Sequence, residues 1–85
     1  MSAYRIEFRP AALRELRKID RSVQTRIQGA IALLAQDPRP PASRPLRGRE
    51  GYRLRVSDYR IIYTINDAIL VVVVVTIGHR RDVYQ

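Results

Sequence analysis

The stretch GYRLRVSDYRIIY at residues 51–63 decides the fold, because apolar and charged residues alternate on both sides of a polar pair. An alternation with a period of two predicts two β-strands, each with one buried and one exposed face. A two-residue turn at Ser57 and Asp58 would fold the strands into a hairpin and set Arg55 directly opposite Arg60 on the exposed face. Because like charges that face each other across a ladder destabilise it, this cationic face indicates a place where an anion binds. The same register predicts three facing pairs on the buried face: Val56 with Tyr59, Leu54 with Ile61, and Tyr52 with Tyr63.

The size and composition of the chain predict a single compact domain, residues 1–85. Its 85 residues are 46% hydrophobic and 28% charged, which allows one modest core and leaves too little chain for a second. The net charge of +8 and the pI near 11.0 indicate a polyanionic partner: nucleic acid, a ribosome-like particle, an acidic protein or an anionic membrane. Lys18 is the only lysine among the 16 basic residues. Genomic base composition can favour arginine over lysine throughout a chain, so a functional role for any one arginine needs its own argument.

The reactive side chains of the chain exclude several kinds of site. Without cysteine and with the single histidine His79, it has no disulfide scaffold, thiolate metal site or two-histidine metal site. No metal or other cofactor is therefore expected. The N-terminus does not resemble a signal peptide, and the longest apolar run, residues 68–77, is too short to span a bilayer. We therefore expect a cytoplasmic protein with no membrane partner.

The residues before the hairpin predict one strand and two helices. Residues 3–8 alternate as a half-buried strand, and Pro10 suits the first position of a helix over residues 10–19. Asp20 or Ser22 would cap a second amphipathic helix, which Pro38 ends.

The remaining segments predict a connection and a third strand for the C-terminal sheet. Residues 37–51 hold four prolines, which favours an exposed, partly extended connection. Residues 69–77 are almost all β-branched and predict a central strand after a turn at Asn66 and Asp67, with or without Ala68. The register that follows decides whether Val73 or Val74 lies beside Arg60. The expected fold is therefore α+β: an N-terminal strand, a helical hairpin and a three-stranded antiparallel meander, with both helices packed on one sheet.

The segment GHRRDVY at residues 78–84 follows the predicted central strand and can fold its polar side chains over the arginine face. Such a site would hold up to five guanidinium groups, one imidazole and one phenol. Guanidinium groups bind phosphate bidentately and stabilise the charge that develops during RNA cleavage, and a tyrosine ring can stack on a base. Arginine stays protonated, so His79, Tyr84, a water or a group from a partner must deprotonate the nucleophile.

The ordered set of these motifs resembles the RelE toxins of the RelE/ParE toxin–antitoxin superfamily. The resemblance lies in the order of elements, Leu46-Arg47-Gly48 ahead of the arginine strand, the hairpin motif, and the ending HRRDVY at residues 79–84. It covers nearly the whole chain. It implies a single RelE-like toxin domain that enters the ribosomal A site and cuts the mRNA codon there by attack of a ribose 2′-OH on the adjacent phosphodiester. It also implies an acidic cognate antitoxin that neutralises the toxin.

The resemblance also implies roles for individual residues. Arg55 would be the base or pair with the oxyanion, and Arg53 and Arg60 would stabilise the phosphate. Arg80 would assist the leaving group, and Tyr84 would stack on or orient a base. The best-studied pattern has lysine on the second strand where this chain has arginine, so an electrostatic role suits Arg55 better. The candidate catalytic residues are Arg53, Arg55, Arg60, Arg80 and Tyr84, with His79 as a candidate acid or base, and the candidate RNA-binding residues are Arg47, Arg49 and Arg81.

Three functions fit the sequence: a ribosome-dependent mRNA endonuclease, a ParE-like DNA gyrase poison without nuclease activity, and a basic adaptor that binds nucleic acid or an acidic partner without harming the cell. The first predicts the joint presence of the arginines and Tyr84, which a gyrase poison does not need. A solvated sheet face is the simpler alternative for Arg53, Arg55 and Arg60.

Overall fold

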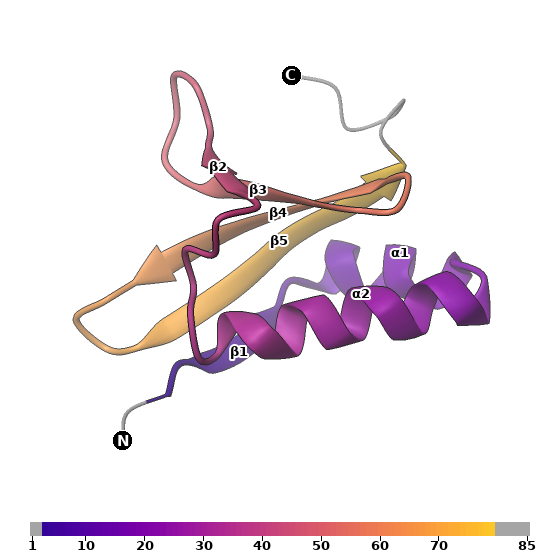
Figure 1. Ribbon diagram of the computed structural model, residues 1–85, viewed down its shortest axis with the longest axis horizontal. Coiled ribbons are helices and arrows are strands. Elements are labelled where there is room, and N and C mark those ends of the chain that lie inside the picture. The colour runs from indigo at the N-terminus through magenta and orange to yellow at the C-terminus, as the bar shows by residue number, and fades with distance from the viewer. Residues whose placement is uncertain (1–2, 80–85) are drawn as a thin grey trace.

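Two helices and a five-stranded sheet form two layers in the computed structural model, which describes residues 3–79 (Figure 1). The strands lie in the order β1-β5-β4-β3-β2, and the β1-β5 pair is parallel while the other pairs are antiparallel. The predicted α+β fold is confirmed. None of the helices within residues 3–79 is long and apolar enough to cross a membrane. The elements in chain order are β1 (Arg5–Phe8), α1 (Pro10–Lys18), α2 (Arg21–Leu34), β2 (Ser43–Pro45), β3 (Tyr52–Val56), β4 (Tyr59–Asn66) and β5 (Val71–His79).

The central hairpin has the register that its alternation predicts. Arg55 lies opposite Arg60, and the three apolar pairs of the buried face also form as expected. Ser57, the first turn residue, takes a left-handed φ of 57°. The hairpin therefore separates an apolar face from a cationic one.

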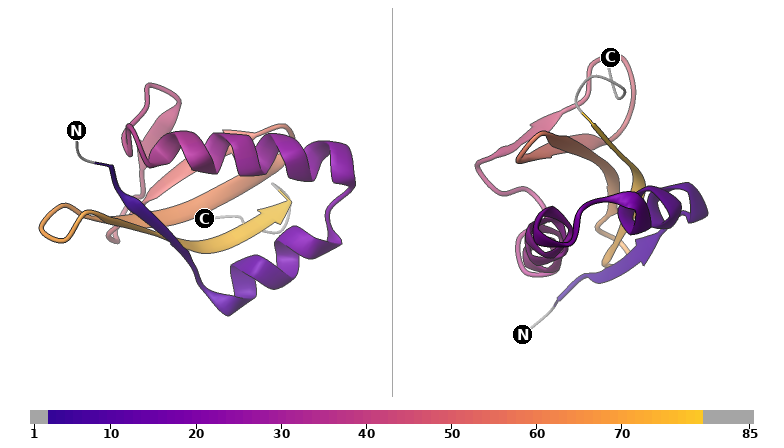
Figure 2. Two further views of the ribbon diagram at one scale, coloured as in Figure 1. Left: turned by 90° about the horizontal axis from the view of Figure 1, so that it is seen from below. Right: turned by 90° about the vertical axis from the view of Figure 1, so that its right-hand side faces the viewer.

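Both helices cover the same face of the sheet, as the two views of Figure 2 show, and the apolar side chains of that face pack against them. Pro10 occupies the first turn of α1, where a missing N–H costs no hydrogen bond. Asp20 is the cap of α2, because its carboxylate accepts the backbone N–H of Ser22 at 3.3 Å. Ser22 itself lies inside the helix, and its hydroxyl donates to the same carboxylate at 2.7 Å.

The core lies between the helices and the sheet. Tyr63 of β4 is its largest fully buried side chain, and its hydroxyl donates to the carbonyl oxygen of Pro38 at 2.7 Å. This bond ties the segment after α2 to the middle of the sheet. The other fully buried large residues are Ile27, Leu34, Ile61, Val72, Val74 and Ile77.

Two details of the sheet differ from the prediction. Within the expected connection, residues 43–45 form the short edge strand β2, which pairs with β3. The register of β5 also differs, because Arg60 lies opposite Gly78 rather than Val73 or Val74. The side chain of Asn66 accepts the N–H groups of Ala68 and Ile69 and so widens the turn. A bulge between Ile62 and Tyr63 shifts the pairing further.

Candidate functional site

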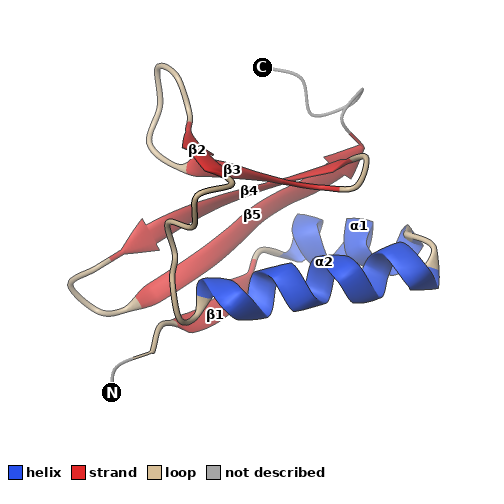
Figure 3. Ribbon diagram, viewed as in Figure 1, coloured by secondary structure: helices blue, strands red, loops and turns tan. Residues whose placement is uncertain are grey.

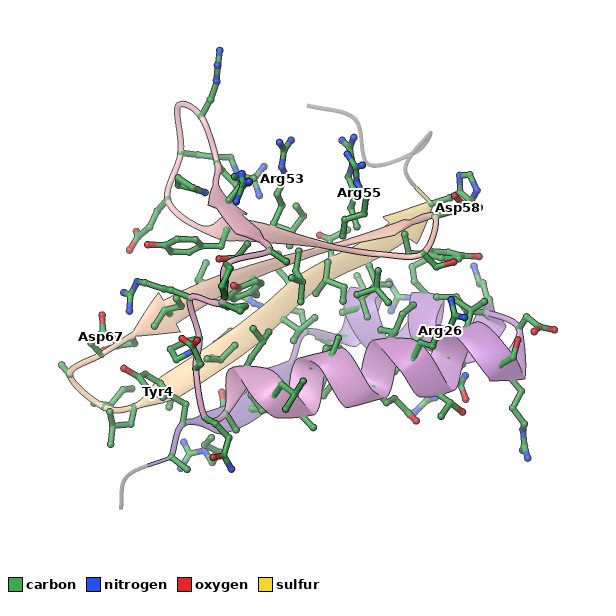
Figure 4. The ribbon with its side chains drawn as sticks, in the orientation of Figure 1. Tyr4, Arg26, Arg53, Arg55, Asp58 and Asp67 are labelled. Atoms are coloured by element: carbon green, nitrogen blue, oxygen red, sulfur yellow. The ribbon has the colours of Figure 1, made fainter. Side chains whose placement is uncertain are left out.

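Arginine side chains gather on the sheet face opposite the helices. Leu54 of β3 is buried in the core, so its neighbours Arg53 and Arg55 point the other way, as Figure 4 shows. Together with Arg60 of β4 they line a cavity of about 290 Å³, here called the arginine cavity. Its two remaining lining residues are Ala42 and Arg44. The structure thus brings three of the predicted site residues together and adds Arg44, which the sequence reasoning missed.

A second cavity of about 480 Å³ adjoins the first and shares Arg53 and Arg60 with it. The loop between β2 and β3 stands over the sheet here, as Figure 3 shows, and contributes the predicted residues Arg47 and Arg49. Pro45, Leu46 and Ile62 make part of its lining apolar. Such a mixed lining suits a nucleoside better than a bare phosphate. We call it the loop cavity.

The two cavities are strongly cationic. Their described lining residues include six arginines and no carboxylate. Arginine remains charged at any physiological pH, so the positive charge does not depend on titration. On the ladder, Arg55 faces Arg60 directly, and like charges in facing positions weaken a ladder.

Gly51 fixes the base of the loop that carries Arg47 and Arg49. Its φ of +127° is a backbone conformation that residues other than glycine rarely adopt. A Cβ at this position would lie 3.1 Å from both the Cδ1 of Leu46 and the carbonyl oxygen of Tyr63. The loop closes where the N–H of Leu46 donates to the carbonyl oxygen of Gly51 at 2.9 Å.

A polar network ties the other end of the sheet together. Arg39 donates to the carboxylate of Asp67 at 2.8 Å and to the hydroxyl of Tyr52 at 3.1 Å. Tyr4 donates to the same carboxylate at 2.6 Å, and Figure 4 shows Tyr4 and Asp67 at one end of the molecule. The hydrogen bonds that Asp67 accepts, chiefly from Arg39 and secondly from Tyr4, lower the pKa of Asp67. The hydrogen bond that Tyr4 donates to this carboxylate raises the pKa of Tyr4. Because Tyr52 precedes Arg53, this network anchors the start of β3.

The remaining predicted site residues lie elsewhere. His79 ends β5 opposite Tyr59, and their rings meet edge to face with centroids 5.4 Å apart. Since Gly78 lies opposite Arg60, alternation puts His79 on the other face of the sheet from Arg60. Arg80, Arg81 and Tyr84 lie outside the described residues.

Comparisons with known proteins agree with this fold. Residues 6–84 match the family described as ParE toxin of type II toxin-antitoxin system, parDE. The chain is 33% identical to the mRNA interferase toxin RelE of Escherichia coli, an alignment that covers 98% of the chain and 92% of RelE. It is 30% identical to Toxin RelG of Mycobacterium tuberculosis, across 96% of the chain and 97% of RelG.

A solved structure gives the same result. The intact RelBE toxin-antitoxin complex of Escherichia coli contains a chain that matches with a TM-score of 0.79 and 34% identity. The match covers 91% of this chain and 96% of that one. The protein therefore belongs to the RelE/ParE family of toxins from type II toxin–antitoxin systems.

Proposed function

We propose that this protein is a ribosome-dependent mRNA endonuclease that cuts codons in the ribosomal A site and so inhibits translation. The observation that carries the proposal is the pair of adjoining cavities with six arginines on one face of the sheet and on the loop beside it. A polyanion that must be gripped and cut fits this arrangement, because arginine binds phosphate bidentately and stabilises developing negative charge. The relative at 33% identity is named an mRNA interferase, which supports the same reaction for this chain.

In this proposal a ribose 2′-OH attacks the adjacent phosphorus, and the 5′-oxygen of the next nucleotide leaves. Arg55 and Arg60 face each other across the ladder and hold the scissile phosphate while its charge increases. The apolar part of the loop cavity takes a neighbouring nucleoside. Arg80 assists the leaving group and Tyr84 stacks on a base, the roles that the family resemblance assigns to them.

The proton of the 2′-OH needs an acceptor other than these arginines, since a guanidinium group cannot take up a proton. The described lining residues of both cavities include no histidine, cysteine or carboxylate. The acceptor in this proposal therefore comes from residues 80–85, from water or from the ribosome. A chain without its ribosomal partner should accordingly cut free RNA slowly.

Primer extension on mRNA in a translating extract tests the proposal. We expect new 5′ ends within codons at stalled ribosomes when the wild-type protein is added. Arg60→Ala should lower the cleavage rate by about 10²–10³-fold, the loss typical of removing one transition-state donor. Arg26→Ala, on the helix layer in Figure 4, is the matched control and should cut normally. A folded wild-type protein that leaves the mRNA intact would refute the proposal.

The natural partner in this proposal is a small acidic antitoxin. The net charge of +8 and the antitoxin-bound state of the relative in the RelBE complex support it. Co-expression with the neighbouring reading frame should give a stable complex that restores growth. If no acidic protein from the neighbouring genes binds the toxin or suppresses it, this part is wrong.

A second candidate function is inhibition of DNA gyrase without RNA cleavage. The match of residues 6–84 to a family described as ParE toxin favours it. A supercoiling assay separates the two functions. Inhibition of gyrase together with intact mRNA would select the gyrase poison, and the reverse would select the nuclease.

A further inference from the structure

The edge strand β2 adds a second opposed pair of arginines to the arginine cavity. Arg44 of β2 lies directly opposite Arg53 of β3, just as Arg55 of β3 lies opposite Arg60 of β4. All four residues line the same cavity. Arg53 and Arg55 are two residues apart on one strand, so the two pairs are offset by about 7 Å along β3.

The guanidinium of Arg44 is held by backbone carbonyl groups that precede it in the chain. Its Nη1 donates to the carbonyl oxygens of Pro41 at 2.8 Å and of Ser43 at 2.9 Å. Neutral carbonyl groups orient the guanidinium without neutralising it. Within residues 3–79, Arg44 forms no ion pair, and its Nε and Nη2 groups donate to no acceptor. The side chain is thus positioned and still able to bind an anion through two further nitrogens.

The number of arginines exceeds what one phosphodiester group can use. A phosphodiester has two non-bridging oxygens and a single negative charge, and two bidentate guanidinium groups occupy both oxygens. In the proposed function, Arg55 and Arg60 form such a set. Arg44 and Arg53 would then face each other with uncompensated charge on the neighbouring ladder, which destabilises a sheet. A second phosphate bound between Arg44 and Arg53, next to the first one along β3, removes this repulsion.

We propose that Arg44, together with Arg53, binds the backbone phosphate next to the scissile one, so that the RNA strand runs along β3. The inference deepens the proposed nuclease function and rests on it. Arg44 is in this view a substrate-binding residue that acts in the ground state and the transition state alike. Its loss should weaken RNA binding without slowing the chemical step.

A binding experiment provides the first test. The probe is a seven-nucleotide single-stranded RNA with 2′-O-methyl groups, which cannot be cut because the attacking hydroxyl is blocked. Fluorescence anisotropy between about 0.1 and 0.3 M salt should show about 10-fold weaker binding for Arg44→Thr, the low end for a hydrogen bond between charged groups. The slope of log K against log salt should fall by about 0.7, the value for one phosphate contact on a single strand.

Two further variants make the binding result specific. Arg44→Lys keeps the charge and loses the planar fork, so it should fall between the wild type and Arg44→Thr. Arg26→Ala, an exposed arginine of α2, should bind within about 2-fold of the wild type at these salt concentrations. Threonine suits an edge strand, and the melting temperature of Arg44→Thr should be at least that of the wild type because one like-charge contact is gone. Wild-type affinity and slope in a folded Arg44→Thr would overturn the inference.

Cleavage kinetics on programmed ribosomes provide the second test. Arg44→Thr should raise the concentration for half-maximal cleavage about 10-fold and leave the rate at saturation within about 2-fold. Arg60→Ala should instead lower the rate at saturation. If Arg44→Thr lowers that rate as strongly as Arg60→Ala does, Arg44 acts on the scissile phosphate and the inference is wrong. If the wild type neither cuts nor binds RNA, the proposed function fails, whereas a normal wild type with an unaffected Arg44→Thr contradicts only this inference.

Discussion

Arg55 illustrates how single residues of the site oppose the stability of the fold. It faces Arg60 on the exposed side of the hairpin, where a charge of the same sign weakens the ladder. Threonine at this position would keep the strand propensity and remove the repulsion. A residue that costs stability in the free protein is expected where an anion later compensates for it.

The substitution Arg55→Thr should therefore stabilise the fold and impair the reaction. We expect the free energy of unfolding to rise by about 0.2–1 kcal/mol, the range for a cross-strand pair, while cleavage falls. Urea denaturation measures the first effect and primer extension the second. Arg5→Thr in β1 is the matched control, since Arg5 faces Val71 and pairs with Glu7 at 2.9 Å. It should not stabilise the protein, and a less stable Arg55→Thr would contradict the argument.

Gly51 and Gly29 form a second contrast between single residues. Gly51→Ala meets Leu46 and Tyr63 at 3.1 Å with a φ of +127°, so it should destabilise the protein by about 1–3 kcal/mol. Gly29 lies within α2 with nothing within 4 Å of an added Cβ, so Gly29→Ala should stabilise by about 0.5–1 kcal/mol. Chemical denaturation of both variants measures the two effects. Equal stability of the two would show that the loop after β2 relaxes around the added methyl group.

Among the elements, the connection between α2 and β3 is anchored to the sheet at several points. Arg39 reaches the β4–β5 turn through Asp67, and Tyr63 holds the carbonyl oxygen of Pro38. On the other side, β2 pairs with β3 and brings Arg44 to the arginine cavity. The anchors thus position an otherwise irregular segment next to the site.

The Asp67 anchor should make the stability of the protein depend on pH in the acid range. Arg39 and Tyr4 lower the pKa of Asp67 in the folded protein below its usual value, about 3.9 in the unfolded chain. The stabilisation is therefore complete above that value and disappears as the pH falls through the lower folded-state pKa. We expect the urea midpoint of Asp67→Asn to lie below that of the wild type by a constant amount from pH 7 down to about pH 4. Between about pH 4 and pH 2.5 the difference between the two midpoints should become smaller. A deficit that widens with acid would contradict the network.

The elements also show where sequence reasoning succeeded and where it failed. The β3–β4 hairpin was predicted to the residue because its strands alternate and only two residues separate them. The register of β5 was wrong because the side-chain bonds of Asn66 and a bulge at Ile62 leave no periodic signal. Strand β2 was missed because three residues that include a proline carry no alternation, and Arg44 was missed with it. The bond from Arg39 to Asp67 joins residues 28 apart in sequence, which no local pattern reveals.

At the scale of the whole molecule, the net charge is +8, and basic side chains of the described residues lie on both layers. Figure 4 shows Arg26 among the helices and Arg53 and Arg55 on the opposite side. The molecule measures 33 × 29 × 25 Å, several times the Debye length of about 8 Å at physiological salt. At physiological salt, charges on the helix layer therefore contribute little to the potential inside the cavities, and they act at longer range only when the salt concentration is low.

Two variants of equal net charge test whether the arginines of the cavities and those of the helix layer contribute differently to RNA binding. Arg14→Gln with Arg26→Gln, and Arg53→Gln with Arg55→Gln, each lower the net charge from +8 to +6. At about 0.15 M salt only the cavity variant should lose RNA affinity, because screening hides the helix layer. At about 0.01 M salt, where the Debye length reaches about 30 Å, both variants should bind RNA more slowly than the wild type. Stopped-flow association rates with a short single-stranded RNA measure this difference. Equal losses at both salt concentrations would mean that total charge, rather than the arrangement of arginines on the sheet, governs RNA binding.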